Sequence, residues 1–368
     1  MKTARVDKLF LLSVVILVVT GFFIFNSASL GLLAKEGARY SNVAFSQTFY
    51  GLFLGTILCL ITSQINYRVW RKYSLFLFIA ALIATSLVFV PGLGMEFGGA
   101  KRWIGIASFS FQPSELLKLA YIIYVAAWIS GLKKNAESFK KGILPLLVIT
   151  AVTGAVILAQ PDTDTFIVIC MAGMAMLVAS GASWKHILII ILISIAGFAL
   201  VAYERPYIRD RLQTFINPSR DSLGSSYQIQ QSLIAIGSGE LFGRGFGQSI
   251  QKFNFLPEPI GDSIFAVMAE EFGFVGSVAL VFMYLFFAFR GFKIVARAPD
   301  SFGGLLALGI VILILTQSFV NISAMLGILP LSGIPLLFVS HGGSAMLATL
   351  AEVGIILNIS KYQRKTLH

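Results

Sequence analysis

Uninterrupted apolar runs of about 20 residues recur along almost the whole chain, and a run of that length is what an α-helix needs to cross a bilayer. The composition agrees, because 57% of the 368 residues are hydrophobic and only 12% are charged, which excludes an ordinary soluble protein. The runs do not alternate polar with apolar residues, so they also exclude a porin-like barrel. We therefore predict an all-α, polytopic integral membrane protein.

These runs predict ten membrane-spanning helices. The first run follows basic residues and so imitates a secretory signal, but it is too long for a cleaved signal peptide, and we interpret it as the first membrane helix. The expected spans are 9–30, 47–65, 74–91, 113–131, 143–160, 164–182, 187–203, 263–289, 303–327 and 342–360.

The basic residues indicate which helix ends face the cytoplasm. Most of the 28 Lys and Arg residues fall in short segments on one side, before the first span and after every second span. By the positive-inside rule this side is cytoplasmic, and so are both termini. This placement accounts for the net charge of +11 without a nucleic-acid partner. The segments 92–112, 204–262 and 328–341 then face outward.

We predict one membrane domain over residues 1–368, with a long extracytoplasmic loop, about 204–262, between the seventh and eighth spans. Loops of that length are usually functional or disordered, and this one is too rich in Phe, Leu and Ile for simple disorder. Its residues 226–239 are predicted to form a short helix on the membrane surface. Cys59 and Cys170 lie within apolar runs, which argues against a disulfide framework or a metal cluster.

The stretch 243–276 carries the most unusual charges. A glycine-rich polar run ends at Asp262, and the apolar run that follows contains Glu270 and Glu271. Carboxylates at a membrane boundary and beyond it are costly, so they call for partners or a function. If a helix starts near Asp262, Glu270 shares the face of Asp262 more nearly, whereas Glu271 needs another partner. Asp262 is either an N-cap residue or a functional acid. Two more charged residues of the stretch are expected in its cluster: Lys252 and Glu258.

Lys101, Arg102 and Trp103 come shortly before the fourth span. They have two interpretations. One is an interfacial anchor, with Trp103 among the headgroups and the cations on lipid phosphate. The other is a clamp for a diphosphate, for which arginine has the better geometry.

The segment QPSELLK (112–118) opens the fourth span. Pro113 suits the first turn of a helix. Glu115 and Lys118 are three residues apart, so they share a face and can pair. Lys118 is also close enough to the helix start to snorkel. A structural ion pair and a site lysine both fit this pattern.

Two shorter motifs flank outward turns. QPDTDT (160–165) places two acids in a very short turn, where a helix cap explains one of them and a metal or substrate role is the weaker alternative. SHGGS (340–344) places paired glycines at the start of the last span, where they allow close backbone approach to a helix or a phosphate.

Together these segments closely resemble one family, the SEDS family (shape, elongation, division and sporulation) of bacterial cell-wall polymerases. Within it, PEPIGDSIFAV and NISAMLGILP are more similar to the division branch (FtsW) than to the elongation branch (RodA). Four positions depart from the family pattern: Ile260-Gly261 instead of His-Thr, Thr163-Asp164 after QPD, PLLF, and SHGGS. The matching pieces are FNSAS (25–29), GGAKRWI (98–104), FQPSELLKLA (111–120), QPD (160–162), TFINP (214–218), 227–274, 321–344 and LNIS (357–360).

The resemblance implies a peptidoglycan glycosyltransferase of the bacterial cytoplasmic membrane that joins lipid II units on the outer side. It assigns the essential acid of the family to Asp262, and it places Glu258, Lys118 and Arg102 on matching motif positions. The other residues expected to bind substrate are Lys101, Gln112, Ser114, Glu115, Ser340 and Gly342. The implied partners are lipid II, the growing glycan strand, a class B penicillin-binding protein that crosslinks the glycan, and other divisome or elongasome membrane proteins.

The expected reaction needs a base and positive charge. The acceptor 4-hydroxyl loses a proton to Asp262 as it attacks the anomeric carbon, which inverts from α to β. The departing diphosphate needs cations, from Lys118, Arg102 and Lys101 or from a divalent ion such as Mg or Mn.

Two other functions fit the same topology. A lipid II flippase would use an intramembrane polar path made of Glu270, Glu271, Glu352 and Lys118. A membrane scaffold for the transpeptidase is the third candidate.

Overall fold

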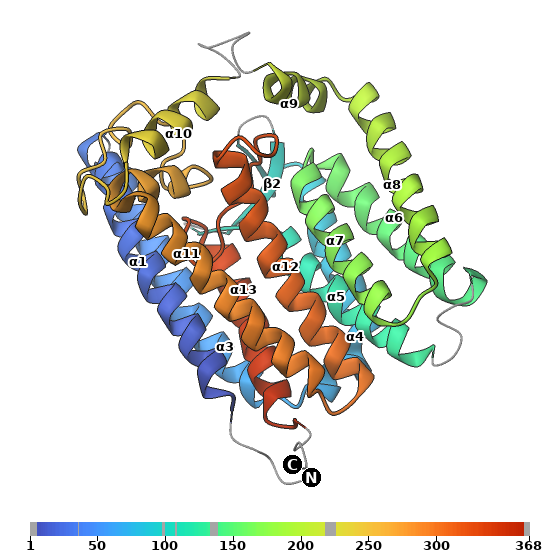
Figure 1. The fold of residues 1–368 in the computed structure, drawn as a ribbon. Coiled ribbons are helices and arrows are strands. Elements are labelled where there is room, and N and C mark those ends of the chain that lie inside the picture. Colours follow the sequence, from blue (N-terminus) through green and yellow to red (C-terminus); the bar gives the residue numbers. More distant parts are fainter. Residues whose placement is uncertain are drawn as a thin grey trace.

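The computed structural model describes residues 6–35, 37–97, 100–106, 109–132, 139–217 and 226–363. Helices dominate it (Figure 1). In chain order the elements are α1 (Lys8–Lys35), α2 (Gly37–Phe45), η1 (Ser46–Leu54), α3 (Gly55–Gln64), α4 (Arg68–Ser86), η2 (Leu87–Phe89), β1 (Gly94–Phe97), β2 (Ala100–Ile106), β3 (Phe109–Phe111), α5 (Pro113–Gly131), η4 (Phe139–Ile143), α6 (Leu144–Ala159), α7 (Thr163–Ala179), α8 (Trp184–Glu204), α9 (Pro206–Ile216), α10 (Tyr227–Ser238), α11 (Ile264–Ala296), α12 (Ser301–Met325) and α13 (Gly343–Ser360).

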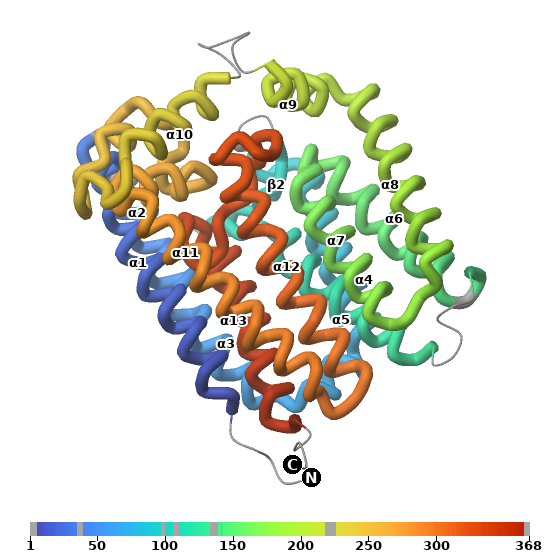
Figure 2. Tube along the Cα trace, viewed as in Figure 1, coloured from blue at the N-terminus to red at the C-terminus, as the bar shows by residue number. Residues whose placement is uncertain are grey.

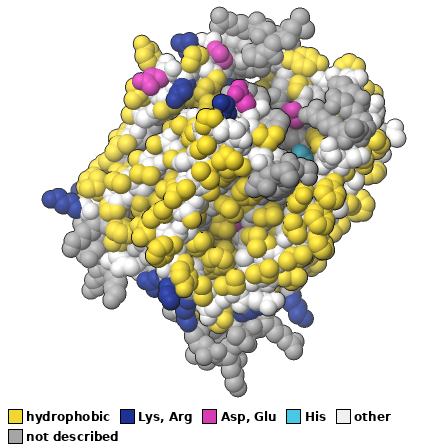
Figure 3. Space-filling model, turned by 180° about the vertical axis from the view of Figure 1, so that it is seen from behind, with side chains coloured by type: hydrophobic (Ala, Val, Ile, Leu, Met, Phe, Trp, Pro, Cys, Tyr) yellow, Lys and Arg dark blue, Asp and Glu magenta, His cyan; other side chains and the backbone are white. Residues whose placement is uncertain are grey.

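The apolar helices confirm a multi-pass membrane protein. Within the described ranges, 8 helices are long and apolar enough to cross a membrane, and the shorter apolar helices α6 and α7 coincide with two further predicted spans. The count of ten crossings stays a prediction. Figure 3 shows that hydrophobic side chains cover most of the middle of one face. Such a surface suits lipid rather than water.

The bundle has a buried centre and an exposed edge (Figures 1 and 2). In the 18-residue apolar stretch of each helix, 94% is buried for α13 and 72% for α12, whereas only 11% is buried for α8. Central α12 packs against α5, α7 and α11. Residues on α12 and α13 can therefore reach several other helices, which makes these two helices the frame on which a site can be built.

Contacts at the chain ends show which helix ends lie together. The backbone N–H of Asp7 donates to Ser360 Oγ at 3.1 Å, and Arg290 donates to the Asp7 carboxylate at 2.7 Å. The start of α1 and the ends of α11 and α13 therefore share one end of the bundle. Asp262, just before α11, lies at the opposite end, where α9 and α10 also lie (Figure 1). The predicted helix at 226–239 is confirmed as α10.

A small antiparallel sheet, which the sequence did not predict, occupies part of the segment 92–112. Its order is β1-β2-β3, with Met95 opposite Trp103 and Ile104 opposite Phe111. Neighbouring residues of a strand point to opposite faces, so Lys101 and Arg102 cannot point the same way. Lys101 and Arg102 therefore contact different partners.

The predicted span 263–289 is broken inside α11. Gly273 has φ 65° and ψ −162°, which is not helical, and a Cβ there would lie 2.4 Å from Gly243 N. The freed backbone groups pair with the preceding loop: the N–H groups of Phe274 and Val275 donate to the carbonyls of Glu240 and Leu241 at 2.9 and 3.1 Å. The part after the break alone is about 34 Å long at 1.5 Å per residue, enough to cross a bilayer. The acids before the break therefore need not lie at membrane depth.

Candidate functional site

Asp262 lies in a tight turn immediately before α11. Its turn is closed by N–H donors of Gly261 and Ser263, which reach the Glu258 carbonyl at 3.0 and 3.3 Å. The N-cap interpretation of Asp262 is wrong, because Ser263 occupies that position and no side chain caps this helix start. The carboxylate instead accepts a hydrogen bond from Gln228 Nε2 at 3.2 Å. Its side chain is thus free of a capping role.

The electrostatics of Asp262 suit proton transfer. Burial raises the pKa of its carboxyl to about 7, the Gln228 hydrogen bond lowers it, and the negative charge of exposed Glu258 raises it. A base with a pKa near ambient pH is ionised often enough to accept a proton and basic enough to hold it.

The SHGGS segment holds the turn that leads to Asp262. Ser340 Oγ donates to the Gly261 carbonyl at 2.6 Å, and the backbone N–H of His341 donates to the Ile260 carbonyl at 2.7 Å. Gly342 N donates to Gln47 Oε1 at 3.0 Å, which ties the segment to η1. Ser340 and Gly342 were predicted to bind substrate. Ser340 supports the Asp262 turn and Gly342 anchors the segment to η1, and substrate binding by either residue stays a prediction.

Lys118 lies in a buried polar cluster. Its ammonium is 2.8 Å from Glu115 Oε2 and donates to Gln317 Oε1 at 2.6 Å. Lys118 and Glu115 are 2% and 3% exposed, so Lys118 does not snorkel to the surface. Glu352 of α13 interacts electrostatically with both, and its Oε2 has no hydrogen-bond partner among the described residues. Glu115 and Gln317 use two of the three ammonium N–H groups of Lys118, so one remains to donate to a further oxygen.

Two amides on α12 connect this cluster to Asp262. Gln317 contacts Lys118, and Asn321, one turn later, donates from Nδ2 to the Asp262 carbonyl at 2.8 Å. Sequence reasoning missed Gln317, Asn321 and Gln228. The last two lie in segments that carry the family resemblance, and Gln317 is a polar residue in an apolar run, four positions before Asn321.

Arg102 is held by the turn that follows α6. Its Nε donates to the Gln160 carbonyl at 3.1 Å, a terminal nitrogen donates to the Pro161 carbonyl, and another lies 3.8 Å from Asp162 Oδ1. The carboxylate of Asp162 caps α7 by accepting from Thr165 N at 3.4 Å, as expected for one acid of this motif. These contacts describe a structural tie, and a direct role of Arg102 with diphosphate stays a prediction.

The remaining predicted residues are Lys101, Gln112 and Ser114. Lys101 is exposed and lies 4.0 Å from Glu96, so it contacts β1 rather than Asp262. Gln112 precedes α5 and is partly buried, without a side-chain capping bond. Ser114 is fully buried, and its Oγ has no hydrogen-bond partner among the described residues. Ser114 is thus a polar group near Lys118 that a ligand or water could satisfy.

Glu270 and Glu271 do not join Asp262 in one cluster. Glu270 accepts from Ser249 Oγ at 2.5 Å and from the backbone N–H of Ile250 at 3.0 Å, and these partners lie in the preceding loop rather than at Asp262. Glu271 does have another partner, Lys252, at 2.7 Å, and both side chains are about 1% exposed or less. These acids fix the glycine-rich loop to α11.

Ser27 of α1 completes this second cluster. Its hydroxyl contacts both Glu271 oxygens, at 2.7 and 2.6 Å, and Lys252 Nζ at 3.2 Å. A buried ion pair is tolerated when further hydrogen bonds satisfy its remaining atoms, as they do here. The cluster joins α1, the loop and α11.

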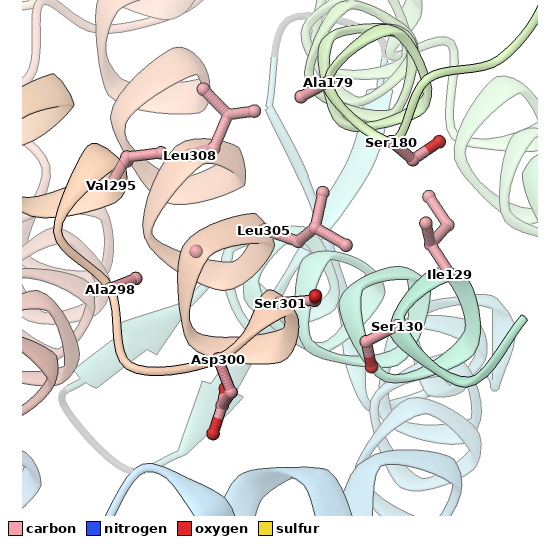
Figure 4. Close-up of a pocket in the computed structure, with 11 residues that line it drawn as sticks. Ile129, Ser130, Ala179, Ser180, Val295, Ala298, Asp300, Ser301, Leu305 and Leu308 are labelled. Atoms are coloured by element: carbon pink, nitrogen blue, oxygen red, sulfur yellow. The ribbon is translucent and has the colours of Figure 1, made fainter. Parts of the chain in front are cut away.

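A pocket of about 410 Å³ lies away from these clusters (Figure 4). It is lined by the ends of α5 and α7 and by the start of α12, including Ser130, Ser180 and Leu305. Its acid, Asp300, caps α12 through Gly303 N at 2.8 Å and accepts from Tyr67 Oη at 2.6 Å. The pocket is at the end of α12 opposite Asn321, so it is not part of the candidate site.

The fold and these contacts define a class: a polytopic membrane protein with the Asp262 carboxyl at one end of its bundle and a buried lysine cluster linked to it through α12. The FtsW/RodA/SpoVE family model, described as cell cycle protein, matches residues 7–365. The chain belongs to this family, the SEDS family.

Named relatives are similar over nearly the full length. The stage V sporulation protein E of Bacillus subtilis is 37% identical, with 99% of each chain covered. A probable peptidoglycan glycosyltransferase FtsW of a Geobacter species is 36% identical, with 97% of each covered.

Solved structures share the fold. A chain from a study of how a peptidoglycan synthase complex coordinates polymerisation and crosslinking has a TM-score of 0.79 and 25% identity, covering 96% of this chain and 97% of that one. The rod-shape-determining protein RodA of Thermus thermophilus has a TM-score of 0.71 and 25% identity, with 98% of each chain covered.

Proposed function

We propose that this chain is a peptidoglycan glycosyltransferase that polymerises lipid II into β-1,4 glycan strands with inversion and releases undecaprenyl diphosphate. The observation that carries the proposal is Asp262, a carboxyl with a pKa of about 7 on the motif position of the essential acid of the family. Relatives named as peptidoglycan glycosyltransferases support the activity.

Asp262 acts as the general base in this proposal. The acceptor 4-hydroxyl gives its proton to the Asp262 carboxylate while its oxygen bonds to the anomeric carbon of the donor. The bond from that carbon to the diphosphate oxygen breaks, and the diphosphate leaves with the electron pair. Gln228 orients the carboxylate, and Asn321 holds its backbone.

Lys118 supplies positive charge to the leaving group. Within the described residues its hydrogen-bond acceptors are Glu115 and Gln317, which leaves one ammonium N–H for an incoming oxygen. A divalent ion is an alternative source of charge. In the described ranges no group of three His, Cys, Asp or Glu side chains could hold a metal, so such an ion would be bound chiefly by the substrate diphosphate, and Asp262 would stay free as the base.

The site faces outward and both termini are cytoplasmic in this proposal. The positive-inside pattern supports the orientation. The contacts that join the start of α1 to the end of α13 also place these two ends together, opposite Asp262. Polyprenyl tails then stay in lipid while the sugars meet Asp262 at the outer boundary. Cysteine accessibility at Glu204→Cys in intact cells tests this orientation, and labelling only after lysis would contradict it.

A class B penicillin-binding protein is the proposed partner, bound through its single membrane helix and the outer loops. The similar chain from a synthase that polymerises and crosslinks supports this pairing. Co-purification with the transpeptidase of the same organism should give a complex with a faster rate. Absence of both a complex and a rate change would reject the pairing. Other divisome or elongasome proteins are proposed as further members of the assembly.

A flippase is the second candidate, but the contacts favour it less. Two of the four residues in its polar path, Glu270 and Glu271, are bound to the 249–252 loop. The deciding experiment is purified protein with lipid II in detergent, assayed for glycan polymer. A detergent solution has no membrane that separates two compartments, so transport of lipid II cannot produce a polymer signal. Polymer formation supports the glycosyltransferase, and its absence with the partner present would refute it.

A further inference from the structure

Two buried amides, Gln317 and Asn321, lie one turn apart on the same face of α12. Both are at most 1% exposed. Each bridges two separate parts of the chain. Burying an amide without partners costs free energy, and the hydrogen bonds that these two amides make offset that cost.

Gln317 binds the lysine cluster to the segment before α13. Its Oε1 accepts from Lys118 Nζ at 2.6 Å, and its Nε2 donates to the Pro335 carbonyl at 3.2 Å. Both atoms of the amide are therefore used. The contact with Lys118 spans 199 residues of sequence.

Asn321 makes a similar pair of contacts, one of them at Asp262. Its Nδ2 donates to the Asp262 carbonyl at 2.8 Å and to the Ile334 carbonyl at 2.9 Å. The two amides thus hold adjacent carbonyls, Ile334 and Pro335. Gln317 also binds the Lys118 ammonium, and Asn321 also binds the backbone carbonyl of Asp262. Asn321 Oδ1 is buried and has no hydrogen-bond partner among the described residues.

We propose that Gln317 and Asn321 are positioning residues that set the separation between Lys118 and Asp262 through one rigid turn of α12. This inference rests on the proposed function, which needs the base and the cation on opposite sides of the reacting carbon. The base lies in the turn before α11 and the cation lies on α5, and α12 contacts both residues. A misplacement of about 1 Å can cost on the order of 10²-fold in rate.

The test is the polymerisation rate of single and paired variants of the full-length protein. Gln317→Met and Asn321→Leu remove the hydrogen bonds at nearly constant volume, and each should lower kcat by roughly 10- to 100-fold. Gln317→Glu keeps an acceptor for Lys118 and should recover part of the rate. Ser318→Ala is the matched control, because it removes a buried polar side chain from the same turn of α12.

Double variants distinguish a positioning role of the amides from a loss of stability. If Gln317 acts through Lys118, then Gln317→Met should cost little more in a Lys118→Met background, and Asn321→Leu should likewise cost little more in Asp262→Asn. Asn321→Leu should also move the midpoint of the pH–rate profile, whereas Gln317→Met should not. Rates are taken per folded protein, below the melting temperature of every variant, so that an unstable variant is still informative.

The outcomes separate this inference from the proposed function. Absence of polymer from the wild-type protein with its partner would reject the proposed function itself, whereas wild-type rates in Asp262→Asn and Lys118→Met would reject their roles and, with them, this inference. Loss in those two variants, with amide variants that match Ser318→Ala or with additive losses in the pairs, would overturn the positioning role and leave the proposed function standing.

Discussion

The Asp262→Asn substitution tests the proposed base most directly. Asparagine keeps the size of the side chain and can still contact Gln228, but it cannot take a proton at neutral pH. General-base assistance is worth about 10²–10⁴ in rate, so polymerisation should fall by that factor while lipid II binding stays nearly intact. Asp262→Glu should recover little, because the extra methylene moves the carboxylate.

The pH dependence follows from the pKa of Asp262, which burial raises to about 7. The base works only when ionised, so the wild-type rate should rise with pH and reach half of its plateau near pH 7. One pH unit below that midpoint about one tenth of the carboxyl is ionised, and the rate should be about tenfold lower than the plateau. The residual rate of Asp262→Asn should not show this rise with pH.

Stability should change in the opposite direction. Because the folded pKa lies above the unfolded value, the carboxyl favours the fold when protonated, and that contribution is lost as pH rises through about 7. Asp262→Asn stays neutral, so its melting temperature should match that of wild type only below the unfolded pKa of 3.8, exceed it increasingly as pH rises from there, and differ most above about pH 7.

The assay is the initial rate of glycan polymer formation from lipid II in detergent, with thermal unfolding of the same preparation. Glu204→Gln is the control, since it removes an exposed carboxylate from the end of α8. An Asn variant with wild-type activity would refute the general base. An inactive variant that is also unfolded would show instability instead, and the pH 8 melting temperature decides between the two.

Three further substitutions test other contacts. Lys118→Met should lower the rate per folded protein, because the lysine is proposed to face the diphosphate; it also leaves Glu115 buried without its cation, so the melting temperature should fall as well, and an unchanged rate per folded protein would make Lys118 purely structural. Lys252→Met leaves Glu271 buried without its cation, so unfolding should become easier by about 3–5 kcal/mol, and a Lys252→Met/Glu271→Met pair should regain part of that loss in thermal denaturation. Gly273→Ala places a Cβ 2.4 Å from a backbone nitrogen at φ 65° and should destabilise the fold, whereas Gly197→Ala, with open space around it, should not; equal melting temperatures would contradict the required break in α11.

The membrane-spanning helices could be predicted because their signal is local. A run of apolar residues must hydrogen-bond its own backbone in lipid, so length and composition suffice to predict a helix. The site motifs were also predictable: Asp262, Lys118 and Glu115 stand in short segments that mark them as charged groups near a helix start. The pairing of Glu115 with Lys118 followed from their spacing alone, and the structure shows it at 2.8 Å.

Only the tertiary structure decided which residues these groups meet. Asn321 reaches Asp262 across 59 positions, and Ser27 reaches Glu271 across 244, and no periodicity or spacing rule carries such distances. The predicted span 263–289 assumed one unbroken helix, and it is broken at Gly273. Gly273 breaks that helix because the loop at 240–245 supplies the missing hydrogen bonds, and a loop from elsewhere in the sequence leaves no trace in the helix that it completes.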